Sequence, residues 1–118
     1  MGATQLLAAR GAPAALQAIA PGVTAAQYYD GWAYQQGAFA LAVNASWASD
    51  LAADQARRAG DEAAWRLLSA AAANPGPWHG YLPLRDHPPL RSSGYASFFF
   101  DWLAHPSYDD YWKRWSID

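Results

Sequence analysis

Three histidines, His79, His87 and His105, are the side chains best suited to general-base chemistry near neutral pH. Two carboxylates stand close to them in sequence, since Asp86 precedes His87 directly and Asp101 precedes His105 by four residues. On a helix the second spacing places both side chains on one face. A histidine packed beside proline, or one facing a helix C-terminus, explains each pair more simply than catalysis.

A serine hydrolase needs more than such a pair. No serine of the chain stands in the Gly-x-Ser-x-Gly turn that exposes a nucleophile. Asp109 and Asp110 are adjacent in a predicted helix, so their carboxylates point about 100° apart and suit a helix start rather than a shared proton. Metal-binding spacings and Gly-rich phosphate loops are missing too, so we expect no cofactor and no metal. These residues form no complete active site.

Aromatic residues dominate the stretch from 24 to 51, which we expect to organise the molecule. It begins with an irregular aromatic group interrupted by Gly31: Tyr28, Tyr29, Trp32 and Tyr34. Large apolar residues then follow at steps of four, which places them on one helix face: Phe39, Val43, Trp47 and Leu51. This pattern predicts a concave apolar wall, which suits a small-molecule pocket. An ordinary hydrophobic core explains it as well, and a core is the more common outcome.

The fold class is predicted to be mainly α, with about five helices and at most one short strand near the N-terminus. We expect a helix over 2–10 that buries Leu6 and Leu7, and a buried strand over 16–20. A long helix over about 37–58 should end at Gly60, and Asp61 should cap a helix over 62–73.

The C-terminal part of the chain begins with a Pro-rich stretch. Residues 75–94 hold five of the eight prolines and are predicted to form an ordered loop. The next two helices each carry an aromatic stripe, and Ser107 is expected to cap the second one. The first stripe comprises Tyr95, Phe98, Phe99 and Trp102. The second comprises Tyr108, Tyr111, Trp112 and Trp115.

The composition limits the partners that the chain could bind. A length of 118 residues predicts one domain, and 53% hydrophobic against 15% charged residues predicts exposed apolar surface and self-association. A net charge of -2 and a single lysine argue against nucleic acid. No apolar run reaches the ~20 residues of a membrane span, and no secretion leader is recognisable, which favours a cytoplasmic location without membrane contact.

Short motifs in a fixed order resemble the CocE/NonD hydrolases, bacterial serine hydrolases that include cocaine esterase and are related to Xaa-Pro dipeptidyl-peptidases. The motifs are Gly2-Ala3-Thr4-Gln5, Ala18-Ile19-Ala20-Pro21, Tyr28-Tyr29 with Trp32, and the tail over 108–116. The resemblance implies that residues 1–24 are a remnant of an α/β-hydrolase core and that residues 25–118 are its helical cap.

The resemblance also implies which residues act and which are missing. Met1 and Gly2 would end the nucleophile elbow, so the serine would precede Met1 by two residues in a parent that is truncated or misassigned here. Substrate contacts are implied for five aromatic residues: Trp32, Trp47, Phe39, Tyr28 and Tyr29. No catalytic residue can be placed, so we expect an inactive chain that needs the missing core and a small ester or peptide substrate.

Two other interpretations stay open. The chain could be a non-enzymatic helical module that docks its Trp-rich face on a partner protein, because aromatic anchors with few charges suit an interface. It would then have an ordered N-terminal segment over residues 1–24. A small self-contained hydrolase that uses Asp101 and His105 is the weakest alternative.

Overall fold

The computed structural model describes residues 2–117 and divides into two compact units. The first unit takes the chain up to residue 38 and again from residue 105, and the second unit is residues 39–104. The chain is mainly helical, with one small sheet of two strands, so the predicted fold class is confirmed.

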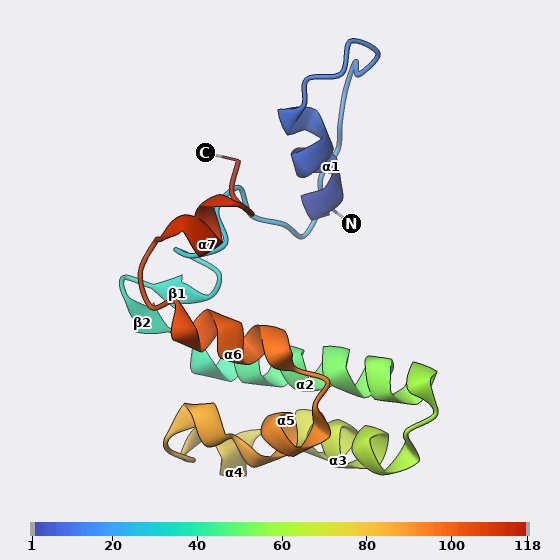
Figure 1. The fold of residues 1–118 in the computed structure, drawn as a ribbon, viewed down its shortest axis with the longest axis vertical. Helices are drawn as coiled ribbons and strands as arrows, with labels where there is room; N and C mark the ends of the chain where they lie inside the picture. Colours follow the sequence, from blue (N-terminus) through green and yellow to red (C-terminus); the bar gives the residue numbers. More distant parts are fainter. Residues whose placement is uncertain (1, 118) are drawn as a thin grey trace. The chain divides into compact units, whose positions relative to one another are not determined.

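Two long helices lie side by side in the second unit (Figure 1). The helices α2 (Leu41–Ala59) and α3 (Glu62–Ala73) pack along each other. The corner between them follows local rules, since Gly60 adopts a left-handed conformation with φ 76° and Asp61 accepts a hydrogen bond from Ala64 N at 3.0 Å. Both terminal signals were predicted from the sequence, although α2 starts four residues later than expected.

The inner face of α2 consists of small residues. Ala48, Ala52 and Ala56 are fully buried against larger side chains such as Leu68 and Phe99. The predicted stripe lies on the opposite side, where exposed fractions are 66% for Val43, 39% for Trp47 and 37% for Leu51. A core role for these three residues is therefore wrong. Alanines let the neighbouring helix approach closely, and the bulky stripe is left facing outward.

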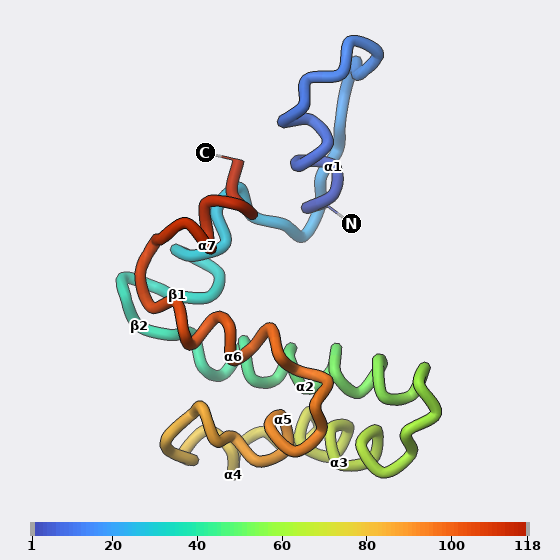
Figure 2. The backbone as a smooth tube through the Cα atoms, viewed as in Figure 1, coloured from blue at the N-terminus to red at the C-terminus, as the bar shows by residue number. Residues whose placement is uncertain are grey.

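The stretch over 75–94 is helical in pieces rather than a loop. It contains α4 (Gly76–His79), the 3-10 turn η1 (Leu84–Asp86) and α5 (Pro88–Ser93), which return from α3 towards α6 (Figure 2). Pro88 takes the first position of α5, where the missing N–H leaves no hydrogen bond unmade. The prolines that predicted a loop thus start helical turns.

The helix α6 (Ser97–Ala104) carries the first predicted aromatic stripe. Phe99 is fully buried, whereas Phe98 and Trp102 are half-buried. Tyr95 precedes the helix and donates from its hydroxyl to Asp61 at 3.3 Å. Burial, followed by the charge of Asp61, raises the pKa of Tyr95.

The first unit contains α1 (Gly2–Arg10) and α7 (Asp110–Lys113), and the small sheet pairs β1 (Tyr34–Gln35) with β2 (Ala38–Phe39). Figure 2 shows the C-terminal segment beside the chain around residue 26, where Ile117 N donates to Ala26 O at 2.9 Å. Arg10 Nη1 also donates to Ser116 O at 3.2 Å. Hydrogen bonds thus tie both ends of the described chain into this unit.

Three predictions for the first unit are corrected. Leu7 is exposed and Leu6 only half-buried, so α1 does not bury both leucines. Asp109, not Ser107, caps α7 by accepting from Tyr111 N at 3.0 Å. Residues 16–20 are in neither helix nor strand, and Leu16 and Ile19 are exposed by 39% and 38%. A strand would need a neighbour for its backbone groups, which the described residues do not place beside it.

Candidate functional site

Tyr29 lies in the aromatic core of the first unit. Its ring stacks on Tyr34 at 4.9 Å and lies 5.8 Å from Trp112, and its hydroxyl donates to Pro106 O at 2.8 Å. Burial, followed by the neighbouring Tyr29 phenol, raises the pKa of Tyr34. Tyr29 therefore holds the tail of the chain in place rather than presenting a free ring.

Tyr28 and Trp32 form a second aromatic pair in the same unit. Their rings meet edge to face at 5.7 Å, and the Tyr28 hydroxyl lies 2.6 Å from Thr24 Oγ1. Both side chains are half-buried. This pair is fixed in orientation yet still open to solvent, as a substrate contact requires.

The second unit contains the other two predicted contact residues. Trp47 stacks on Trp102 with 6.0 Å between ring centroids and 14° between ring planes, and Trp102 lies 5.2 Å from Phe98. Phe39 packs edge to face on the buried Phe99 at 5.7 Å. Trp47 thus belongs to an exposed surface and Phe39 to the core. We call Val43, Trp47 and Leu51, together with Trp102, the outer aromatic face.

Sequence reasoning missed the role of Trp102. The i, i+3, i+4, i+7 spacing placed it on a helix stripe, but nothing in the spacing indicated that its ring would stack on Trp47 from another helix. The partner of His105 was missed as well. It is Asp109, at i+4, instead of Asp101, the candidate partner at i−4.

His105 pairs with Asp109, the residue that caps the N-terminus of α7. His105 Nδ1 lies 2.6 Å from Asp109 Oδ2, and the imidazole stacks on Tyr111 with 4.3 Å between centroids. This hydrogen bond holds the pKa of the Asp109 carboxyl below its usual range. The His105 carbonyl also accepts from Trp112 Nε1 at 2.9 Å. These contacts give His105 a structural role.

The remaining histidine pair does not form either. His87 is buried, with 1% of its surface exposed, while Asp86 is exposed. Neither ring nitrogen of His87 has a hydrogen-bond partner within residues 2–117. Burial, and then the charge of His79, lowers the pKa of His87. A buried imidazole without an orienting carboxylate is poorly placed to act as a general base.

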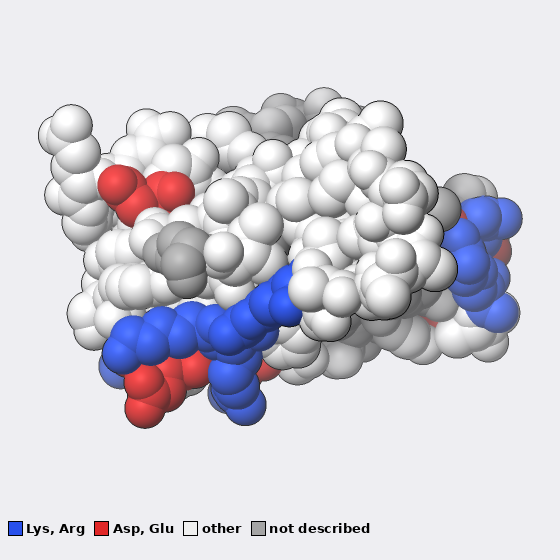
Figure 3. Space-filling view, turned by 90° about the horizontal axis from the view of Figure 1, so that it is seen from above, with Lys and Arg blue, Asp and Glu red and all other residues white. Residues whose placement is uncertain are grey.

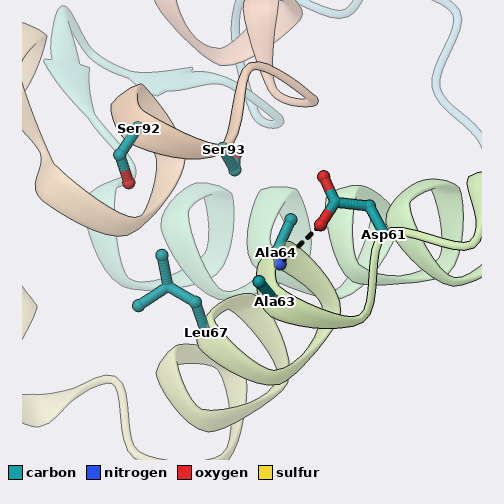
Figure 4. Close-up of a pocket in the computed structure, with 6 residues that line it drawn as sticks. All are labelled: Asp61, Ala63, Ala64, Leu67, Ser92 and Ser93. Atoms are coloured by element: carbon teal, nitrogen blue, oxygen red, sulfur yellow. Dashed lines mark hydrogen bonds between the residues drawn. The ribbon is translucent and has the colours of Figure 1, made fainter.

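A groove of about 260 Å³ lies between the start of α3 and α5, on the second unit (Figure 4). Ser92 and Ser93 line it, but their hydroxyls donate to Pro88 O at 2.8 Å and Leu90 O at 3.0 Å. The Asp61 carboxylate is occupied by Ala64 N and the Tyr95 hydroxyl. None of the predicted contact residues lines this groove, and its polar groups are already committed to the fold.

Charged side chains cover little of the face shown in Figure 3, most of which is uncharged. Several charged side chains of the chain pair with neighbours on the same helix, as Arg57 and Arg58 do with Asp54. The hydrogen bond from Arg57 lowers the pKa of Asp54. Within residues 2–117 no three acidic or histidine side chains are grouped to hold a metal ion. None of the described helices combines the length and apolar character needed to cross a membrane.

Comparison with known proteins gives one match. The family model described as X-Pro dipeptidyl-peptidase (S15 family) matches residues 1–118, which is the whole chain. No significant match was found among curated proteins or among solved structures.

Proposed function

Because the chain belongs to the X-Pro dipeptidyl-peptidase (S15) family, a family of hydrolases, we propose that residues 25–118 form the lid of a serine hydrolase's substrate pocket. The family match confirms the resemblance to the CocE/NonD hydrolases. The observation that carries the proposal is the outer aromatic face, where Trp47 is 39% exposed yet fixed by stacking on Trp102.

A lid needs apolar groups that are both rigid and uncovered. Trp47 stacks on Trp102, and the Trp102 ring also contacts the tilted ring of Phe98. These two contacts fix the outer aromatic face before any ligand binds. A preorganised aromatic surface contacts an apolar acyl group without first losing side-chain freedom, and it excludes water from the reacting bond. We therefore assign substrate shaping to this surface.

The five aromatic residues then divide into two roles. Trp47 and Trp32 each contact the apolar part of an ester or amide substrate, an acyl or Xaa-Pro dipeptidyl group. Tyr28 supports the Trp32 ring at 5.7 Å. Phe39 and Tyr29 are each anchored in the core of their own unit, where they serve packing.

The catalytic residues belong to an α/β-hydrolase body that residues 1–24 join. The segment 16–20 supports this assignment, because its apolar side chains Leu16 and Ile19 are exposed. Packing against another protein body would cover these side chains. The proposed role of the chain is recognition, and the proposed role of the body is bond cleavage.

The 118-residue chain alone is expected to release no p-nitrophenol from p-nitrophenyl esters above the buffer rate. Its serine hydroxyls that have hydrogen-bond partners donate to main-chain carbonyls, as Ser49 does to Ala45 O at 2.8 Å, so no base activates them. The release of p-nitrophenol measures turnover, and a fluorophosphonate probe that reacts with activated serines is the second measurement. Labelling of any serine in the folded chain would contradict the assignment of catalysis to another body.

Ethyl benzoate, an uncharged aromatic ester, is expected to shift the indole N–H resonances of Trp47 and Trp102 in a titration followed by nuclear magnetic resonance. Trp47→Ala should weaken this binding about fivefold, since an aromatic ring contact contributes on the order of 1 kcal/mol. Trp115→Ala is the matched control, because Trp115 is 48% exposed but lies outside the outer aromatic face. Equal weakening by both substitutions would refute the proposed contact surface.

A second candidate function rests on the same outer aromatic face. An exposed, rigid group of Val43, Trp47 and Leu51 would also serve as the anchor of a protein–protein interface, including one between two copies of this chain. A folded chain whose outer aromatic face does not respond to the ester would favour this docking function over the lid.

A further inference from the structure

We propose that His87 is a pH-sensitive latch that holds the segment of α4, η1 and α5, residues 76–93, closed against the rest of the second unit. His87 sits between this segment and α6. Its ring centroid lies 5.9 Å from Trp78 on α4 and 5.9 Å from Phe99 on α6, and only 1% of its surface is exposed. The imidazole therefore fills the contact between the segment and the core.

This site accepts a neutral ring and rejects a charged one. Both ring nitrogens of His87 lack hydrogen-bond partners, and so does Nε2 of the neighbouring His79, among the residues that the structure describes. Leaving a neutral polar atom unpaired inside a protein has a modest cost, whereas an unpaired buried charge has a far larger one. Protonation of His87 thus opposes the closed arrangement.

Among the described residues, no acidic side chain contributes to stabilising a protonated His87. The ionisable group whose charge reaches His87 is His79 on α4, which is itself cationic when protonated and lowers the pKa of His87 further. The charged side chains that the neighbouring elements contribute are exposed or partly exposed. They are Arg85 and Asp86 on η1, Arg91 on α5, Asp101 on α6, Asp50, Asp54, Arg57 and Arg58 on α2, and Asp61, Glu62 and Arg66 at the start of α3.

The direction of the pH effect follows from linkage. The pKa of His87 is lowered in the closed state, whereas in an open segment it returns towards the ordinary histidine value of about 6.5. Between these two values the open state binds more protons than the closed state, so closure strengthens as pH rises. The latch is closed above about pH 6.5 and weakens as the pH falls below this value.

Hydrogen exchange of the 118-residue chain at pH 7.5 and pH 5.0, expressed as protection factors, tests the latch. The reporting amides are Asp86, His87 and Arg91, which bond within the segment to Pro83 O, Leu84 O and His87 O. We expect their protection to fall several-fold more at pH 5.0 than that of Trp65 in α3 and of Asn74, which caps the C-terminus of α3. In His87→Met, which keeps an apolar side chain of adaptable shape there, this difference should disappear.

His105→Gln is the matched control, since it removes a histidine from the other unit and should leave the pH response of the segment intact. An unchanged response in His87→Met, or equal protection of the segment at both pH values in the parent chain, would overturn the proposal. If His87→Met does not fold, the imidazole resonance of His87 in the parent chain decides. A titration midpoint below 6.5 supports the latch, and one at or above 6.5 refutes it.

Discussion

Replacing Phe99 with alanine is expected to lower the free energy of unfolding of the second unit by roughly 3–5 kcal/mol. Phe99 is fully buried, and its ring lies 5.7 Å from Phe39, 5.9 Å from His87 and 5.4 Å from Phe100. The substitution leaves a cavity that the segments around Phe39 and His87 would have to move to fill. Urea unfolding followed by far-ultraviolet circular dichroism gives the measurement.

Phe100→Ala is the control on the same helix. Phe100 is half-buried, and its ring lies beneath the Arg91 guanidinium at 5.1 Å, so its removal opens a site that solvent can enter. The loss should be clearly smaller than for Phe99. Because small domains are stable by only about 5–15 kcal/mol, Phe99→Ala should leave a substantial part of the unit unfolded at moderate urea. Similar losses for the two variants would show that the core is centred elsewhere.

Local rules fixed the elements that were predicted correctly. The corner between α2 and α3 needs a left-handed residue followed by a side chain that accepts from the first helical turn, and Gly60 and Asp61 supply both. The helix over 2–10 was likewise found as α1. These features depend on neighbours in sequence, so the sequence of this chain alone was enough to place them.

Which face of α2 is buried depends on the helices that pack against it, and the sequence of α2 alone does not identify them. Both of its faces are apolar, one with alanines and one with Val43, Trp47 and Leu51, so periodicity alone could not select the inner face. The choice was made by the close approach of neighbouring helices, which admits only small side chains. The same limit hid the stacking of Trp47 on Trp102, because the two residues come from helices far apart in sequence.

The candidate site was predictable in kind but not in arrangement. The order of short motifs identified the family. Neither of the two candidate general-base pairs forms, since His87 is buried without a carboxylate partner among the described residues and His105 pairs with Asp109. Tyr29 and Phe39 turned out to be anchored in cores. Aromatic residues serve packing and recognition with the same chemistry, and only the tertiary contacts separate the two uses.

Trp112→Ala is expected to destabilise the first unit by roughly 3–5 kcal/mol. Trp112 is 2% exposed, and its ring lies 5.8 Å from Tyr29, 6.3 Å from Tyr34 and 5.0 Å from Tyr111. The substitution removes the ring that holds the aromatic stretch and the C-terminal tail together. Urea unfolding, with hydrogen exchange to locate the loss at amides such as Tyr34, measures the effect.

Trp112→Phe separates packing from hydrogen bonding. Phenylalanine keeps a ring among the three tyrosines but loses the indole N–H that donates to His105 O at 2.9 Å. A buried acceptor without its donor costs roughly 1–3 kcal/mol, so Phe should lie between the parent chain and Ala. If Phe and Ala were equally destabilising, the hydrogen bond to His105 would be the dominant contribution and the aromatic packing a minor one. We expect the aromatic packing to contribute more than the hydrogen bond, because the Trp112 side chain makes three ring contacts and one hydrogen bond to His105.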